Sequence, residues 1–389
     1  MQTTFKKAIP VVVLSVMIAI IGFVPTLSVN AENTVGKTLV VKKVLTKADQ
    51  GVTTPAENFS FTAEAHSFNG AMNQKTECPA LTSVTSNYDG TEDTDADAAK
   101  PGKQLNVLSG DMLDGVNFTK AGQYTYTVKE IAGTTEGMTY SKAEYLASLM
   151  VVKSGDGKFT VEKIMIKKIK DDEGKDVTND SKTEYNPEEA NNNLAFNNVY
   201  DKKDGNDNPG GGEVTEPDKK GFVVNKVVAT ATDASFGFKL TLVAPAGATQ
   251  AAVDALPTAK IIKADGTLKE TVTMSAYGTS TEFTLKKGER LVLADVLLGS
   301  TAKVEESDTQ GFTPTVEANG VSAVNDVDTL KNNGVILSDA GNNYATVTNT
   351  EQTLTGILMS NLPLILLFVI AAGGIAVYAR NRRKANSEI

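Results

Sequence analysis

Three side chains that could join this chain to itself lie in strand-like segments of its first half. Lys43 lies in one apolar segment, Glu130 ends a Tyr/Thr/Val segment, and Asn198 follows a second apolar segment. Side chains two residues apart on a strand point to the same face, so each of the three shares its face with apolar neighbours. The sequence therefore predicts a lysine, a glutamate and an asparagine in one apolar interior. The neighbours on these faces are Leu39, Val41 and Leu45, then Tyr124, Tyr126 and Val128, and then Leu194 and Phe196.

The same residue types recur in the same order in the second half of the chain, as Lys226, Glu306 and Asn349. A strand lysine often extends to the surface, and an asparagine at a strand end often begins a turn, so one such trio alone is weak evidence. The prediction of a reactive trio therefore depends on its recurrence in both halves of the chain. In three places two polar residues of a suitable type are adjacent, and the second of each pair has the spacing that puts it on the apolar face, which we call the parity argument. The first residue of each pair stays an alternative. The pairs are Lys42 and Lys43, Asn197 and Asn198, and Glu305 and Glu306.

Burial determines what such a trio can do. An unpaired charge in an apolar interior is very unfavourable, and burial lowers the pKa of a lysine and raises that of a glutamate. A neutral amine is a nucleophile, and a carboxamide with a polarised oxygen is an electrophile; a protonated glutamate can donate the polarising hydrogen bond and carry protons. The expected product is a Lys–Asn amide, formed once with loss of ammonia and promoted by the glutamate.

The segments that carry these residues have the pattern of β-strands. Phe236, Phe238, Leu240 and Leu242 alternate with glycine or polar residues. Period two, enrichment in Thr, Val and Tyr, and frequent glycine breaks are typical of antiparallel sandwiches. We therefore predict an all-β protein with two tandem immunoglobulin-like β-sandwich domains.

The predicted domains are residues 32–200 and 220–350. Between them, residues 201–219 are dense in glycine, proline and charge and are predicted to form a flexible linker. Within the first domain, the polar residues 66–110 are predicted to form a long inserted loop.

Both ends of the chain predict export. Residues 1–31 combine Lys6 and Lys7 with an apolar segment and a small-residue cleavage site, as in a signal peptide. Residues 351–389 contain an apolar stretch at 357–379 that is long enough to span a bilayer, followed by four basic residues that favour the cytoplasmic side. A polar pentapeptide precedes this stretch, and the three parts in this order form a sorting signal. The pentapeptide is Gln352, Thr353, Leu354, Thr355 and Gly356.

Composition excludes several kinds of function. The whole chain carries −9; the signal peptide contributes two positive charges and the tail a net three, which leaves −14 for the exported part and argues against nucleic acid as a partner. With one histidine and one cysteine, His66 and Cys78, the chain can form neither an internal disulfide nor the usual zinc sites nor a Ser-His-Asp triad. We expect no metal, no cofactor and no enzyme that turns over a substrate.

Several stretches resemble the major (backbone) pilins of streptococci and related Gram-positive bacteria. In particular, the chain is similar to pilins with an isopeptide-linker domain followed by a collagen-adhesin-B-type domain. The stretches are residues 39–43, 118–130 and 196–198 in the first domain and 283–289 and 347–349 in the second.

This resemblance implies internal isopeptide bonds Lys43–Asn198 and Lys226–Asn349, with Glu130 and Glu306 as the promoting acids. It implies that a pilus-specific sortase cleaves after Thr355 and joins it to a lysine of the next subunit, although Gln352 and Thr353 replace the usual Leu and Pro of the motif. The acceptor lysine would be Lys175 or Lys182, according to the alignment.

The implied function is therefore the structural shaft subunit of a covalent pilus on the cell wall, with other copies of the chain and accessory pilins as partners. The alternative is a wall-anchored adhesin or accessory pilin that binds a host surface ligand without polymerising. The absence of tryptophan and of a third domain favours the shaft subunit.

Overall fold

The computed structural model of the chain describes residues 37–90, 102–178, 181–204, 221–340 and 342–351. It also describes residues 362–364, 366–372, 374–375 and 377–378 near the C-terminus. The predicted signal peptide, the pentapeptide and the basic tail lie outside these residues, so the predictions about them stay predictions.

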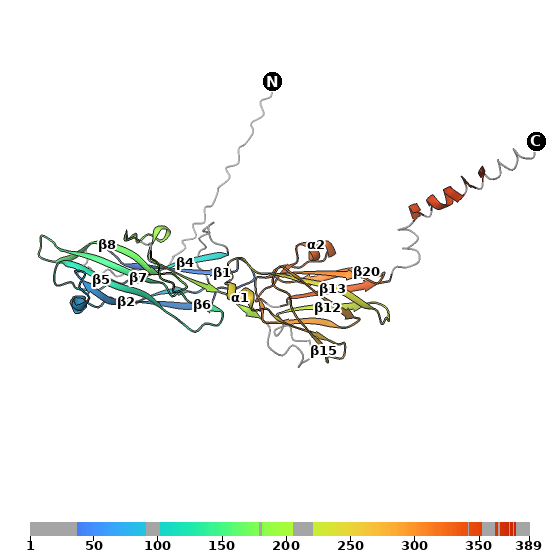
Figure 1. Cartoon of the computed structure of the whole chain (residues 1–389), viewed down its shortest axis with the longest axis horizontal. Coiled ribbons are helices and arrows are strands. Elements are labelled where there is room, and N and C mark those ends of the chain that lie inside the picture. The colour runs from blue at the N-terminus through green and yellow to red at the C-terminus, as the bar shows by residue number, and fades with distance from the viewer. Residues whose placement is uncertain are drawn as a thin grey trace, which may run out of the picture.

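The first domain is a sandwich of two sheets (Figure 1). One sheet has the order β4-β1-β10-β6, formed by β1 (Val40–Lys47), β4 (Lys103–Asp111), β6 (Met138–Thr139) and β10 (Ala195–Tyr200). The facing sheet has the order β3-β2-β5-β7-β8-β9, formed by β2 (Glu57–Phe68), β3 (Val84–Tyr88), β5 (Gly122–Ile131), β7 (Glu144–Lys153), β8 (Phe159–Lys170) and β9 (Thr183–Glu184). The 3-10 helices η1 (Met72–Glu77) and η2 (Glu189–Asn191) lie in connections between strands.

The second domain is also a two-sheet sandwich. One sheet has the order β15-β14-β17-β12-β22-β20, formed by β12 (Phe222–Val228), β14 (Thr258–Ile262), β15 (Leu268–Val272), β17 (Arg290–Ala294), β20 (Thr313–Asn319) and β22 (Tyr344–Thr350). The other has the order β16-β13-β19-β21, formed by β13 (Ser235–Val243), β16 (Ser280–Lys286), β19 (Thr301–Asp308) and β21 (Val335–Ile336). The helices α1 (Gln250–Asp254) and α2 (Val327–Asn332) lie in connections.

The apolar residues that alternate along the predicted strands are the residues that the structure buries. Along β13, Phe236, Phe238, Leu240 and Leu242 are buried while the residues between them are partly exposed. Burying a large apolar side chain contributes about 1.5–3 kcal/mol, so this face fixes which side of each strand meets the core. The predicted all-β, two-sandwich architecture is confirmed.

In both domains the first and last long strands are parallel neighbours. β1 pairs with β10, and β12 pairs with β22. Because a parallel pair needs a long crossover, nearly the whole of each domain lies between its two paired strands.

Two sequence predictions need correction. Residues 66–110 are not one long loop, because this range contains the end of β2, all of η1 and β3, and all of β4 except its last residue. The linker does not begin at residue 201, because β11 (Lys203–Asp204) pairs with β18 (Val296–Leu297) of the second domain. Residues 205–220 lie outside the described part of the chain.

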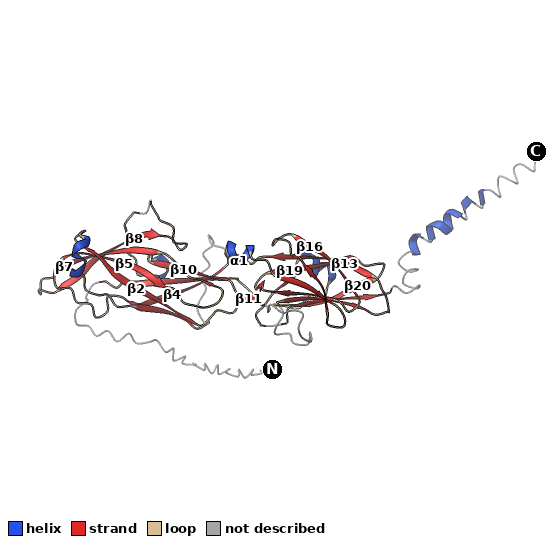
Figure 2. Cartoon of the chain, turned by 60° about the horizontal axis from the view of Figure 1, so that its bottom comes forward, coloured by secondary structure: helices blue, strands red, loops and turns tan. Residues whose placement is uncertain are grey.

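The two domains contact each other end to end (Figures 1 and 2). The Asp339 carboxylate accepts two hydrogen bonds from Thr53, one from the backbone N–H at 2.8 Å and one from the side-chain hydroxyl at 3.0 Å. The same carboxylate forms an ion pair with Lys202 at 2.8 Å. Gly51 has a φ of 80°, and a Cβ built there would lie 2.1 Å from the carbonyl oxygen of Leu337. Only glycine tolerates that φ and that close approach to the Leu337 carbonyl. The contact between the domains therefore depends on a glycine at position 51.

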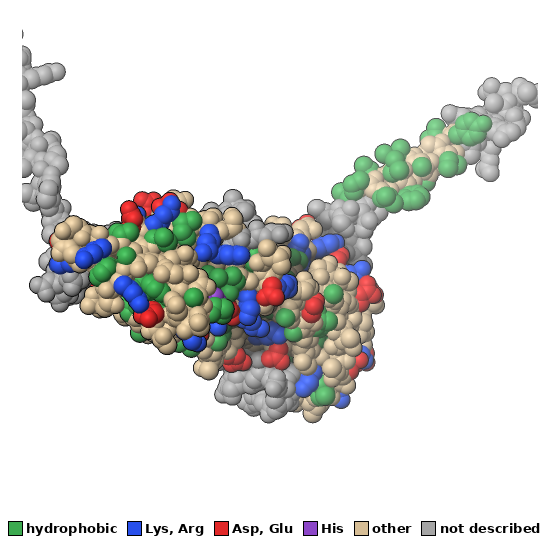
Figure 3. All heavy atoms as spheres, turned by 60° about the vertical axis from the view of Figure 1, so that its left-hand side comes forward, with side chains coloured by type: hydrophobic (Ala, Val, Ile, Leu, Met, Phe, Trp, Pro, Cys, Tyr) green, Lys and Arg blue, Asp and Glu red, His purple; other side chains and the backbone are tan. Residues whose placement is uncertain are grey.

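The described residues from 362 to 378 are helical and exposed, and nearly all are apolar (Figure 3). Within the described residues, no helix is long and apolar enough to cross a membrane. The span predicted for 357–379 includes residues outside this set.

Candidate cross-linking sites

Each trio joins the two sheets of its sandwich. Lys43 and Asn198 lie on the paired strands β1 and β10, whereas Glu130 lies on β5 of the facing sheet. In the second domain Lys226 and Asn349 lie on β12 and β22, and Glu306 on β19 of the facing sheet.

The register of the two parallel pairs is the same in both domains. Lys43 is opposite Phe196, two residues before Asn198, and Lys226 is opposite Val347, two residues before Asn349. Residues two apart share a face, so the lysine and the asparagine point into the same interior.

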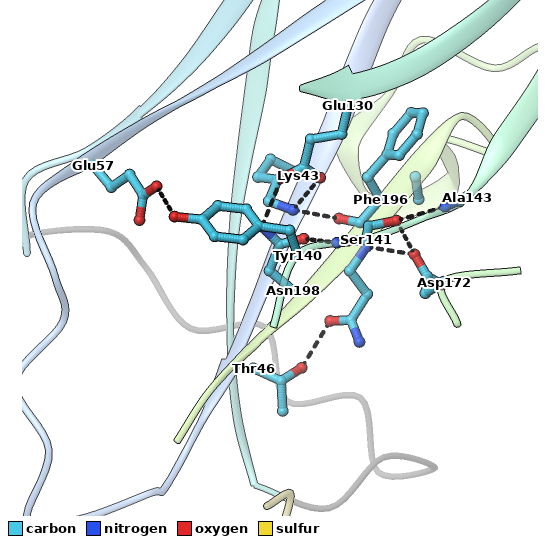
Figure 4. Close-up of polar contacts among 12 residues, drawn as sticks. Lys43, Thr46, Glu57, Glu130, Tyr140, Ser141, Ala143, Asp172, Phe196 and Asn198 are labelled. Carbon is cyan, nitrogen blue, oxygen red and sulfur yellow. Dashed lines mark hydrogen bonds and ion pairs between the residues drawn. The ribbon is translucent and has the colours of Figure 1, made fainter. Parts of the chain in front are cut away.

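In the first domain Glu130 contacts both of its partners (Figure 4). Its Oε2 lies 2.8 Å from Nζ of Lys43, and its Oε1 accepts a hydrogen bond of 2.6 Å from Nδ2 of Asn198. Lys43 Nζ also donates to the carbonyl oxygen of Phe196 at 3.4 Å. The side chains of Lys43 and Glu130 are 0% exposed, so the amine and the acid are shielded from bulk solvent.

The second domain has a closely similar arrangement with fewer hydrogen bonds. Oε1 of Glu306 lies 2.7 Å from Nζ of Lys226 and accepts a hydrogen bond of 3.0 Å from Nδ2 of Asn349. Within the described residues, Oδ1 of Asn349 and Oε2 of Glu306 are buried without a hydrogen-bond partner.

Aromatic rings cover both amines. Nζ of Lys43 lies 4.7 Å from the ring centroid of Phe59, and Nζ of Lys226 lies 4.3 Å from that of Phe236. Burial lowers the pKa of Lys43 to about 8 and also lowers the pKa of Lys226, although the paired glutamates oppose both shifts. Burial likewise raises the pKa values of Glu130 and Glu306 against the effect of the lysines. Both shifts favour the neutral amine and the neutral acid that the chemistry needs.

The contacts differ from the sequence prediction in one respect. The glutamates were expected to hydrogen-bond the carboxamide oxygen, but both contact its nitrogen. A carboxyl group there is placed to take a proton from the attacking amine and give it to the departing nitrogen. The carboxamide oxygen of Asn198 instead accepts a hydrogen bond of 2.7 Å from the backbone N–H of Ser141.

The alternative members of the polar pairs lie outside the two sites. Asn197 accepts a hydrogen bond from the hydroxyl of Thr46, and Glu305 forms an ion pair with Lys331 at the surface. The side chain of Lys42 is half-buried, whereas Lys43 is fully buried. The parity prediction of which residue faces inward is therefore confirmed for all three pairs.

Two further predicted residues, Lys175 and Lys182, are exposed on the first domain and are not among the described residues that contact Lys43, Glu130 or Asn198. Lys175 is exposed in the turn after β8, and its backbone N–H donates to Asp171 at 2.8 Å. Lys182 is exposed just before β9, and its Nζ lies 3.3 Å from the hydroxyl oxygen of Ser148.

Sequence reasoning missed Phe59, Phe236 and Ser141. The two phenylalanines had a signal, because each lies in the second strand of its domain, in an alternating apolar pattern. Ser141 had none, because it acts through its backbone and lies outside any strand.

Comparisons with known proteins bear on both domains. The family model of the Spy0128-like isopeptide containing domain (FctA) matches residues 39–201. A model for a domain of unknown function (DUF7601) matches residues 213–351, so the collagen-adhesin-B-type likeness of the second domain stays a prediction. No curated protein matches the chain.

Several solved pilus proteins align with most of the chain. The major pilin T-13 from Streptococcus pyogenes is 21% identical, with 82% of this chain and 98% of that chain covered and a TM-score of 0.31. Another major pilin from Streptococcus pyogenes is 19% identical, with 81% and 99% covered and a TM-score of 0.33. The pilus-presented adhesin Spy0125 (Cpa) is 10% identical, with 80% and 99% covered and a TM-score of 0.22.

TM-scores this low do not establish a common arrangement of the whole chains, so the assignment depends on the domain match. Residues 39–201 belong to the Spy0128-like isopeptide-containing domain family, which confirms for this domain the resemblance to Gram-positive pilins drawn from the sequence.

Proposed function

We propose that this chain is the shaft subunit of a sortase-assembled covalent pilus, and that each of its domains closes a Lys–Asn isopeptide bond by itself. One observation carries the proposal: in both sandwiches a buried glutamate contacts a buried lysine and a buried asparagine that lie on the parallel first and last strands.

The bond chemistry follows from these contacts. The neutral amine of Lys43 attacks Cγ of Asn198, and the neutral Glu130 gives its proton to Nδ2, so that the Cγ–Nδ2 bond breaks and ammonia leaves. The resulting Glu130 carboxylate then takes the extra proton from the new amide nitrogen. Lys226, Glu306 and Asn349 would react in the same way. The promoting acid is regenerated, but the lysine and asparagine are consumed, so each domain reacts once.

The position of these bonds suits a protein under tension. β12 begins on the side of the second domain that is next to the first domain, and the chain leaves the second domain at the end of the parallel strand β22, on the far side (Figure 1). A Lys226–Asn349 bond would therefore carry force directly from one end of the domain to the other. The residues between the two cross-linked positions would not be extended.

The same arrangement suits head-to-tail assembly. β22, which the pentapeptide follows in the sequence, ends at the far end of the second domain, whereas Lys175 and Lys182 are exposed on the first domain. A pilus-specific sortase would join Thr355 of one subunit to one of these lysines of the next, in a polymer held at the cell wall and joined by accessory pilins.

Cell-wall extracts test the proposal. Immunoblots should show a ladder of high-mass species that collapses to the monomer when Thr355 and Gly356 are deleted. The control is a deletion outside the pentapeptide, such as residues 205–220. This deletion should leave the ladder of high-mass species unchanged. A single monomer band from the wild-type chain would reject the shaft function.

A further inference from the structure

The carboxamide groups of the two sites differ in one contact. In the first domain Oδ1 of Asn198 accepts the backbone N–H of Ser141 at 2.7 Å. In the second domain Oδ1 of Asn349 is buried and has no hydrogen-bond partner in the described part of the chain. The lysine–glutamate ion pair and the hydrogen bond from the carboxamide nitrogen to the glutamate occur in both sites. In the first site these two contacts use different oxygens of Glu130, and Lys43 also donates to the carbonyl oxygen of Phe196, whereas in the second site both contacts use Oε1 of Glu306.

This oxygen is where negative charge develops during the reaction. When an amine adds to the carboxamide carbon, the C=O bond opens and the oxygen becomes an oxyanion. A fixed N–H donor at hydrogen-bond distance stabilises that charge more than it stabilises the neutral amide, and such a donor accelerates acyl transfer by about 100–1000-fold in a buried site. A backbone N–H also cannot accept a hydrogen bond, so it fixes the carboxamide with its oxygen toward Ser141 and its nitrogen toward Glu130.

Asp172 holds this donor in place (Figure 4). Its Oδ1 accepts the Ser141 hydroxyl at 2.6 Å and also the backbone N–H of Asn197 at 2.9 Å, next to the reacting residue. The Ser141 hydroxyl oxygen accepts the N–H of Ala143 at 3.1 Å, which secures the turn. Lys168 lies 3.2 Å from Oδ2 of Asp172 and offsets its negative charge near the forming oxyanion.

We infer that the backbone N–H of Ser141 is a one-donor oxyanion site for the Lys43–Asn198 bond, that Asp172 is its positioning residue, and that the first domain therefore cross-links faster than the second. The inference rests on the proposed isopeptide chemistry and deepens it: the two sites share their reacting groups, but only the first has a described donor for the oxyanion.

A pulse of isotopically labelled amino acids followed by peptide mass spectrometry of the full chain, purified in detergent, measures both bonds in one molecule. In the wild type, the Lys43–Asn198 peptide should reach half of its final level before the Lys226–Asn349 peptide. Ser141→Pro removes the N–H and should slow the first bond about 100-fold. The second bond is the internal control and should keep its wild-type rate.

Milder variants separate positioning from folding. Asp172→Ala removes the acceptor that holds Ser141 and should slow the first bond, whereas Asp172→Asn keeps an oxygen that can accept both hydrogen bonds and should restore most of the rate. Rescue by asparagine would not be expected of a residue needed only for its charge. Circular dichroism shows whether Ser141→Pro folds. If it does not, the two Asp172 variants test whether the Ser141 N–H speeds the first bond.

Three results would overturn the inference. These are a wild-type rate for the first bond in folded Ser141→Pro, equal rates for the first bond in Asp172→Ala and Asp172→Asn, or a second bond that forms as fast as the first in the wild type. Absence of both bonds from the wild-type chain would instead reject the proposed function itself.

Discussion

Lys43 and Glu130 form an ion pair of 2.8 Å in which both side chains are fully excluded from solvent. Desolvating an ion pair of this kind is expensive, and a buried pair is commonly no more stabilising than apolar residues of the same volume. The pair is therefore poorly explained as a device for stability alone. It is well explained as the reactant state of a condensation, because a proton passed within the pair yields the neutral amine and acid.

The lysine gives the uncrosslinked first domain a characteristic pH dependence. Asn198→Ala removes the electrophile and keeps Lys43, whose pKa burial lowers from 10.5 to about 8. Between these values the unfolded lysine binds a proton that the folded lysine has lost, so the free energy of unfolding should rise with pH, by at most about 1.4 kcal/mol per unit. Urea unfolding from pH 7.5 to 9.5 measures this slope.

A matched variant isolates the contribution of Lys43 from those of tyrosines that titrate nearby. Asn198→Ala combined with Lys43→Met should show a flatter pH dependence than Asn198→Ala alone. If the two slopes agree, the buried amine is not the titrating group.

The second domain should resist extension only while its cross-link is intact. Pulled between the linker before Gly221 and Glu351, the wild-type domain should not lengthen beyond its short ends. Asn349→Ala should release the chain between β12 and β22, which is about 400 Å when extended. Single-molecule force spectroscopy measures this length. Equal extensions of the two proteins would contradict the proposed force path.

The contact between the domains should depend on Asp339. Asp339→Ala removes the acceptor for Thr53 and the ion-pair partner of Lys202. We expect the interface to weaken by about 1–3 kcal/mol and the angle between the domains to vary more widely in small-angle scattering. Asp328→Ala, on α2 away from this contact, is the control. A scattering profile that Asp339→Ala leaves unchanged would show that the other interface contacts suffice.

The two candidate acceptor lysines make separable predictions. If Lys182 is the acceptor, Lys182→Ala should abolish the high-mass ladder in wall extracts, and Lys175→Ala should leave it intact; the reverse pattern assigns Lys175. Both lysines are exposed, so neither substitution should affect folding. A ladder that survives the double substitution would exclude both.

The sequence predicted which face of each strand points into the core, because residues two apart on a strand share a face and the apolar residues of that face are buried. Lys43 and Lys226 lie among apolar residues of the same parity, and the structure buries both. Strands β3 and β4 were missed because polar side chains interrupt their apolar pattern: Ser86, Gln104 and Asn106 are all buried. The pairing of β11 with the second domain was missed because two polar residues can pair through their backbones without any apolar pattern.

The chemistry of the sites was predictable from residue types, but its geometry was not. A lysine, a glutamate and an asparagine on inward faces predict a condensation. Whether the glutamate meets the oxygen or the nitrogen of the carboxamide depends on how the facing sheet is placed. The role of Ser141 depends on a backbone N–H, which every residue except proline has.

The intact mass of the exported chain, residues 32–355, tests the central claim most directly. Self-formed bonds in both domains predict a mass lower than that of the sequence by two molecules of ammonia. Glu130→Ala and Glu306→Ala should each restore one of them, and Glu305→Ala, on the neighbouring surface position, should restore none. A wild-type mass equal to that of the unmodified sequence would contradict the account.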